Sequence, residues 1–260
     1  MGFRRLFGFG DDGNAPEPPE IDTQITTLAP LPGHPIEGEI VIKGGSRGIA
    51  IEYFYLQVVA KARDYEGTVE DLEMTSLDVR RGHFGVAPGT EERVPFSGRL
   101  PWECPVTELG GNGIGVDLSL TTQLDVGRES PVQDLDFLHV ASPPLYEAVL
   151  DAFAEEGYGG ADSQVIYAYI PGVEQHRPHY QTFFVTDPAR GLDRLGELEV
   201  VFLQNAVGAM VHVRRAARSQ LDWKDKPPTR SFPAAHHEVG KVDFGERVRR
   251  VLAELSVVDG

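Results

Sequence analysis

The sequence predicts an all-β protein, and three observations lead to that class. Most apolar residues fall in short segments that alternate with polar residues or are rich in β-branched and aromatic side chains. Glycine and proline are frequent, with 29 and 19 of the 260 residues, which is typical of a chain with many turns. Only two segments have the spacing of an amphipathic helix. The length fits one large β domain or two of ordinary size.

Residues 21–126 have the pattern of a β-sandwich, because strand-like segments follow one another with no helical segment between them. Asp64–Glu73 is polar and predicts a turn region, and Ser130–Val140 predicts a further extended segment. In residues 115–126, Val116, Leu118 and Leu120 share one face. Strands are expected at Ile21–Leu28, Ile36–Lys43, Ile49–Ala60, Leu77–Val86, Glu91–Leu100 and Gly115–Val126.

The stretch from Arg93 to Thr107 is unusually rich in proline, with Pro95, Pro101 and Pro105 each lacking a backbone donor. Proline is excluded from central strands, so the stretch predicts a bent edge strand that crosses a β core and then leaves it. We expect Trp102 to be buried where the chain crosses between sheets. On this interpretation the stretch is architectural, and function lies on other surfaces.

The second half is also predicted to be mainly β, with one helix at its start and one at its end. The first helix has Ser142 as its expected N-cap, Pro143 at its first position and Gly157 at its end. The second helix, Asp243–Leu255, has an apolar stripe and Asp243 as N-cap. Strands are expected at Ser163–Ile170, His179–Val185, Gly196–Leu203 and Gly208–Arg214, and a loop at Asp222–Pro233.

Composition limits the classes of function. The net charge is −16 and the pI about 4.9, which makes nucleic acid a poor partner. A single cysteine, Cys104, rules out a disulfide framework within the chain and fits a reducing compartment. No apolar run approaches the length of a membrane span, and the N-terminus lacks a signal-peptide core. We therefore expect a cytoplasmic protein.

The histidines do not predict a metal site. His176 and His179 are three residues apart in a loop that contains Pro178, and a zinc site needs more ligands. His236 and His237 are adjacent and point to opposite faces of an extended chain. Solvated loops explain both pairs, so no metal and no cofactor are predicted.

The remaining reactive groups also favour structural interpretations. Cys104 lacks a positive neighbour that would lower its pKa, so a buried inert thiol is favoured over a nucleophile. The glycine-rich segment 110–115 leads into a strand and lacks the Lys and Ser/Thr of a phosphate loop, which favours a β turn. Arg214–Arg215 and Arg249–Arg250 are candidate anion sites, although a solvated edge is the favoured interpretation.

The N-terminal residues 1–10 are basic and aromatic, and are followed by a linker-like segment that ends at residue 19. A segment of this type suits a partner surface or a membrane interface, with arginines in water and rings buried. The alternative, which we favour, is a tail that packs on its own domain or stays unstructured. The candidate contact residues are Phe3, Arg4, Arg5, Leu6 and Phe7.

Several segments together resemble the SpoOM (sporulation-control protein) family of bacterial arrestin-like proteins. They follow one another in the family's order from about residue 28 to residue 255, so the resemblance covers nearly the whole chain. The Pro95–Glu108 segment resembles the family's central motif, with Cys104 where Thr is more usual. The other matching segments are Leu31–Gly45, Pro143–Leu150, Leu195–Leu203, Val213–Arg215 and His237–Phe244.

The resemblance implies an arrestin-like fold of two tandem β-sandwich domains, with a short mid-chain helix and a C-terminal helix. It implies domains at 20–142 and 143–260 after a tail and linker at 1–19, and one of His236 and His237 packed against the C-terminal helix. It also implies a non-enzymatic regulator or adaptor that binds a protein partner in control of sporulation or development. The alternatives are a membrane-surface or trafficking protein that docks weakly through its N-terminal tail, and a hydrolase built on a β-sandwich.

Overall fold

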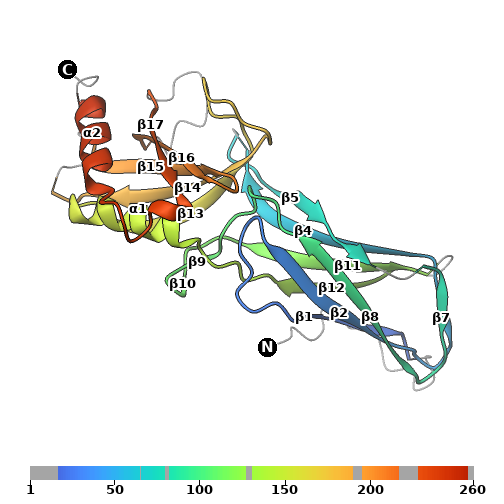
Figure 1. The fold of residues 1–260 in the computed structure, drawn as a ribbon. Coiled ribbons are helices and arrows are strands. Elements are labelled where there is room, and N and C mark those ends of the chain that lie inside the picture. The colour runs from blue at the N-terminus through green and yellow to red at the C-terminus, as the bar shows by residue number, and fades with distance from the viewer. Residues whose placement is uncertain are drawn as a thin grey trace.

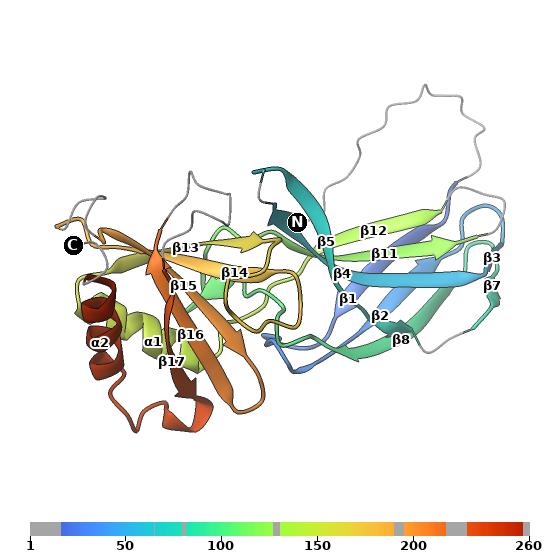
Figure 2. The same ribbon diagram turned by 90° about the horizontal axis from the view of Figure 1, so that it is seen from above.

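The computed structural model describes residues 17–256, apart from 65, 80–81, 127–130, 190–194 and 217–227. Within these ranges the chain forms β-strands in layered sheets and two α-helices (Figure 1). The all-β class and the positions of both helices are therefore confirmed. The elongated body has a β-sandwich at one end and a sheet with both helices at the other (Figure 2).

The sandwich is formed by strands of the first half. One layer has the strand order β1-β2-β8-β6, and the other contains β12, β11, β4 and β5. The short strands β3 and β7 pair at the far end, and β9 and β10 form a hairpin. The bounds are β1 (Glu20–Ile25), β2 (Pro35–Lys43), β3 (Ile49–Ile51), β4 (Tyr53–Arg63), β5 (Val69–Ser76), β6 (Asp78–Val79), β7 (Phe84–Val86), β8 (Glu91–Arg99), β9 (Glu108–Leu109), β10 (Asn112–Gly113), β11 (Leu118–Asp125) and β12 (Val132–Phe137).

Alternation of side chains builds the sandwich core. On β11 every second residue is buried, namely Leu118, Leu120, Thr122 and Leu124. This is the period-2 pattern of a strand with one face on the core, and the face predicted from the sequence is confirmed. The Thr122 hydroxyl pairs with the Thr23 hydroxyl of β1 at 2.6 Å, so this polar group is satisfied where the two layers meet.

The second half is a five-stranded antiparallel run, β13 to β17, with both helices on one face (Figure 2). The face under the helices is apolar, and a smaller apolar cluster of Ile166, Ile170, Tyr180 and Val201 lies on the other side of the sheet. The bounds are α1 (Pro144–Glu155), β13 (Gly159–Ile166), β14 (Tyr180–Thr186), β15 (Glu197–Gln204), β16 (Gly208–Arg215), β17 (Arg230–Ala235) and α2 (Gly245–Ser256).

The two halves share one nine-stranded sheet. β13 pairs with β4 in parallel at two positions, Val165 opposite Ala62 and Ile166 opposite Arg63. The Gln181 side chain adds two hydrogen bonds of 2.8 Å to the main chain of Val106, one as acceptor and one as donor. The halves are thus joined by main-chain bonds as well as by the connecting chain. The domain boundary expected at residues 142 and 143 stays a prediction.

Several local expectations are wrong. Strand β5 occupies Val69–Ser76, so the turn expected at Asp64–Glu73 is confined to its first residues, and β17 starts inside the loop expected at Asp222–Pro233. Ser142 does not cap α1. The N-cap is Pro143, and the Ser142 hydroxyl donates to the Glu147 carboxylate. Proline has no side-chain acceptor, so the shift leaves α1 with no side-chain cap.

Other local expectations hold. Gly157 follows the end of α1 with a φ of 97°, a left-handed conformation that glycine adopts without strain. The Asp243 carboxylate accepts a hydrogen bond of 2.7 Å from the Gly245 N–H, as an N-cap does at the start of a helix. The glycine-rich segment lies in the β9–β10 hairpin, where Gly110 and Gly111 both have positive φ.

The proline-rich stretch is close to the prediction. β8 pairs with β2 over all nine residues, and within the described part of the chain it pairs with β6 only at Phe96 and Ser97, so Pro95 lies beside a single paired strand there. Trp102, however, is only half-buried. It lies between the two halves of the molecule and not between the layers of the sandwich. The reason is that Pro101 ends the strand pairing and sends the chain towards the second half.

Candidate functional site: a pocket between the halves

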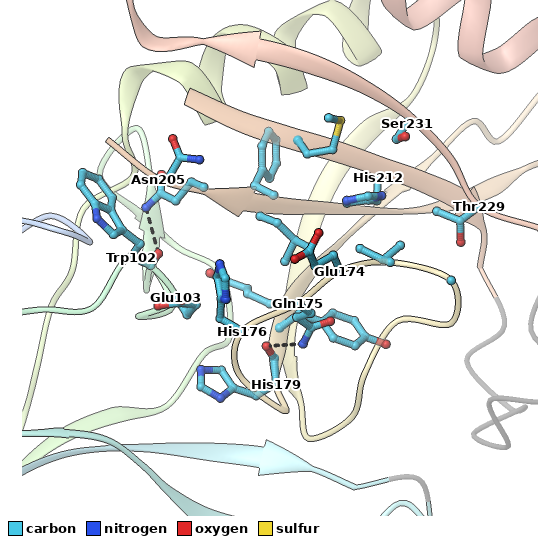
Figure 3. A pocket seen from close by; sticks show the side chains of 18 of the residues that line it. Trp102, Glu103, Glu174, Gln175, His176, His179, Asn205, His212, Thr229 and Ser231 are labelled. Atoms are coloured by element: carbon cyan, nitrogen blue, oxygen red, sulfur yellow. Dashed lines mark hydrogen bonds between the residues drawn. The ribbon is translucent and has the colours of Figure 1, made fainter. Parts of the chain in front are cut away.

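A pocket of about 760 Å³ lies where the proline-rich stretch meets the second sheet (Figure 3). Trp102, Glu103 and Cys104 line it from the first half. The β13–β14 connection, strands β14 to β17 and Tyr146 of α1 line it from the second. Known small-molecule sites range from about 300 to 1,000 Å³, so the volume suits a ligand. The proline-rich stretch thus lines a candidate site, and the expectation that function lies on other surfaces stays a prediction.

Trp102 is held in place from both halves. Gly33 has a φ of 74°, and a Cβ added there would lie 2.2 Å from the indole ring, so glycine is required for this close packing. The ring also meets His34 edge-on, with 5.9 Å between centroids, and His236 with 6.4 Å. The Trp102 carbonyl accepts a hydrogen bond of 3.1 Å from the Gln204 side chain. These contacts fix one wall of the pocket.

Three imidazoles line the pocket, but they differ in exposure. His176 is exposed, whereas His179 and His212 are buried. Burial lowers the pKa of His179 and lowers that of His212 to about 4, so His212 is neutral at neutral pH. No group of three or more metal-binding side chains occurs in the described part of the chain.

The other histidine pair lies outside the pocket. The His236 ring bonds the Asn205 carbonyl at 3.0 Å, and neither His236 nor His237 lines the cavity. Glu238 links this segment to the C-terminal helix, because its carboxylate accepts two hydrogen bonds from Arg247 of α2, at 2.6 and 2.8 Å. These bonds lower the pKa of Glu238 to about 2. The packing expected of His236 or His237 against that helix stays a prediction.

Cys104 is buried and unpaired, as expected. Burial raises the pKa of its thiol, so the sulfur is protonated at neutral pH and is a poor nucleophile. Burial likewise raises the pKa of Tyr146, whose ring stacks on Phe202 with 4.0 Å between centroids. These groups supply packing to the pocket floor and no acid–base chemistry.

Arg214 corrects a sequence-based expectation. It is not on a solvated edge but is buried, and its guanidinium donates to Glu199 and, at 3.0 Å, to the Tyr180 hydroxyl. Glu199 lies directly opposite on the neighbouring strand and is equally buried. Since the charge is neutralised inside the protein, Arg214 is not an anion site. The second arginine pair is on the surface, where Arg249 bonds Glu156 at 3.0 Å and Arg250 lies 3.5 Å from Glu246.

The candidate contact residues Phe3, Arg4, Arg5, Leu6 and Phe7 lie outside the described residues. In the part of the chain that is described, no helix is long and apolar enough to cross a bilayer. Several pocket residues were missed from the sequence, among them Glu174, Gln204 and His212. The polar side chains at alternate positions 212 and 214 of an apolar strand were the signal for His212, because alternation places them on one face.

Comparison with known proteins identifies the family. A model of the SpoOM protein family matches residues 8–216. The chain belongs to the SpoOM family. A relative, the sporulation-control protein spo0M of Bacillus subtilis (strain 168), is 28% identical over 213 residues, which is 80% of each chain.

The crystal structure of Spo0M from Bacillus subtilis superposes with a TM-score of 0.76 at 23% identity. It covers 91% of this chain and 98% of that chain. The likeness confirms the arrestin-like fold. The resemblance seen in the sequence is therefore correct both for the family and for the fold of this SpoOM chain.

Proposed function

We propose that this SpoOM protein is a non-enzymatic, cytoplasmic regulator that acts by binding protein partners in the control of sporulation or development. The relative from Bacillus subtilis is named a sporulation-control protein, which supports the process. The binding mechanism rests on one structural observation. The outer face of the sandwich carries an exposed apolar surface.

We call this surface the outer patch: Tyr53 and Tyr55 on β4, and Leu135 and Phe137 on β12. Their side chains are between 47% and 64% exposed. β11 runs between the two strands, with Thr121 opposite Leu135 and Gln123 opposite Tyr55. The uncharged Thr121 and Gln123 therefore lie between Leu135 and Tyr55, whereas Asp125 lies opposite Tyr53.

An exposed apolar surface of this kind favours contact with another protein. Covering large exposed rings with a partner stabilises the complex by about 25 cal/mol per Å² of apolar area removed from water. Tyrosine and phenylalanine are also enriched in the centres of protein interfaces. Apolar side chains on the outer face of a sheet suit a folded partner better than a small ligand, which needs a concave site.

The test uses two variants in the host bacterium. Leu135→Ser with Phe137→Ser removes half of the outer patch, and Val207→Ser removes an equally exposed apolar side chain in the turn between β15 and β16. We expect cross-linking in cells to recover the same partners with the wild type and Val207→Ser, and to lose them with the double variant. Sporulation should fail in the double variant alone. Normal sporulation and unchanged partners in the double variant would refute the proposal.

A further inference from the structure

The polar groups in the pocket between the halves are short of hydrogen-bond partners. The Gln204 side chain is buried, and its nitrogen donates to the Trp102 carbonyl, which fixes the orientation of the amide. Its oxygen Oε1 is buried and has no hydrogen-bond partner among the residues that the structure describes. A buried acceptor without a donor costs about 1–3 kcal/mol, so a ligand that brings an N–H or O–H group is favoured here.

His212 adds a second group that can bond to a ligand. Its side chain is only 7% exposed, and it makes no hydrogen bond with the described residues. Figure 3 shows its ring and the Glu174 side chain facing the same space, from β16 and from the β13–β14 connection. A neutral imidazole has one lone-pair nitrogen, so His212 also accepts a hydrogen bond from a ligand.

The charged residues of the lining indicate the sign of the charge that a ligand would carry. Glu103 and Glu174 both line the pocket, and neither carboxylate makes a hydrogen bond or ion pair with the described residues. No lysine or arginine is among the described residues of the lining. Among the described lining residues, a phosphate or carboxylate ligand would meet the two carboxylates and no lysine or arginine, whereas a cation would neutralise both carboxylates.

The apolar part of the lining fits the carbon skeleton of such a cation. Trp102 is half-buried at the pocket, and Met210 and Leu203 lie on the opposite sheet. An indole face attracts an ammonium group by about 0.5–2 kcal/mol, and the aliphatic side chains cover methylene groups.

We propose that this pocket binds a small organic polycation of the di- or polyamine class. Its ammonium groups are neutralised by Glu103 and Glu174 and donate hydrogen bonds to Gln204 and His212. This inference is independent of the outer patch and goes beyond the proposed protein-binding function, because it assigns a small-molecule ligand to a different surface.

Spermidine is the probe, titrated calorimetrically into the full-length protein at about 0.15 M salt, where loose attraction to the acidic surface is screened. We expect one saturable site. Glu103→Gln and Glu174→Gln should each weaken binding about tenfold or more, because each removes a charge-assisted hydrogen bond. Glu70→Gln, which removes the same charge from an exposed position on β5, should leave the affinity unchanged.

Three results would overturn the proposal: no saturable heat with spermidine, an equal loss in Glu70→Gln, or comparable binding of inorganic phosphate. Glu174 is exposed on a loop, so its variant tests the site even if Glu103→Gln fails to fold. Circular dichroism melts of all the variants show which of them fold as the wild type does.

Discussion

The buried pair of Glu199 and Arg214 gives the strongest stability prediction. The two residues face each other across β15 and β16, and their side chains are only 5% and 3% exposed. Replacing Glu199 by Leu leaves a guanidinium in the interior without its counter-charge. Breaking one partner of a buried pair typically costs about 3–5 kcal/mol, since the remaining charge stays desolvated.

A surface pair of the same geometry provides the control. Lys61 and Asp71 also face each other across two antiparallel strands, 2.6 Å apart, but their side chains are 52% and 65% exposed. Exposed pairs contribute about 0–1 kcal/mol, because water and salt screen them. Asp71→Asn is therefore expected to change stability by less than about 1 kcal/mol.

The assay is urea unfolding at neutral pH, followed by circular dichroism. With an m-value of about 3 kcal/mol/M, Glu199→Leu should lower the midpoint by about 1–1.7 M. The double variant Glu199→Leu/Arg214→Met removes both charges and should recover most of the loss, because the uncompensated charge is gone. The reasoning is refuted if Glu199→Leu costs no more than Asp71→Asn, or if the double variant is as unstable as the single one.

The other predictions concern a glycine and two carboxylates. Gly33→Ala should destabilise the protein by about 2 kcal/mol or more in a thermal melt, because the added Cβ would overlap the Trp102 ring. The control is Gly111→Ala, which has a similar φ but open space around it and should destabilise the protein by only about 1–2 kcal/mol. Burial and neighbouring carboxylates raise the pKa of Asp136 to about 7, so the folded state favours the protonated form. The stability of the protein should therefore fall as the pH rises from about 4 to 7. Asp136→Asn should flatten that fall in urea midpoints, and an unchanged slope would contradict it. Arg247 on α2 lowers the pKa of Glu238 to about 2, so the charged carboxylate stabilises the folded state at pH 7 and this contribution is lost towards pH 2. Glu238→Gln should therefore destabilise the protein at pH 7 but not at pH 2, as measured by the midpoints of urea unfolding at the two pH values.

The sequence predicted the elements whose pattern is local. The alternation on β11 and the apolar stripe of α2 each bury one face, so the period of the apolar residues was sufficient. Strand β5 was missed because its residues are mostly exposed and include three carboxylates. It is held by pairing with β4, which is a tertiary contact that its own composition does not encode.

The pocket was harder to predict than the fold, because it depends on which segments meet. Cys104 could be identified as an inert buried thiol from its neighbours alone. The role of Trp102 could not be identified in this way, because it depends on contacts with Gly33 and His236. These residues lie 69 positions before Trp102 and 134 positions after it in the sequence. Arg214 was misplaced for the same reason. An arginine at the end of a strand pattern is usually exposed, and only the presence of Glu199 on the neighbouring strand and Tyr180 on the strand after it permits its burial.

The parallel pairing of β4 with β13 limits how the two halves can move against each other. A swinging motion of one half against the other would have to break the parallel pairing of β4 with β13. It would also have to break the 2.8 Å hydrogen bond from the Tyr167 N–H to the Arg63 carbonyl and the two hydrogen bonds between Gln181 and Val106. Strand β4, which carries Tyr53 and Tyr55 of the outer patch, is also the strand to which the second half is paired, so the outer patch and the sheet behind the pocket belong to one hydrogen-bonded unit.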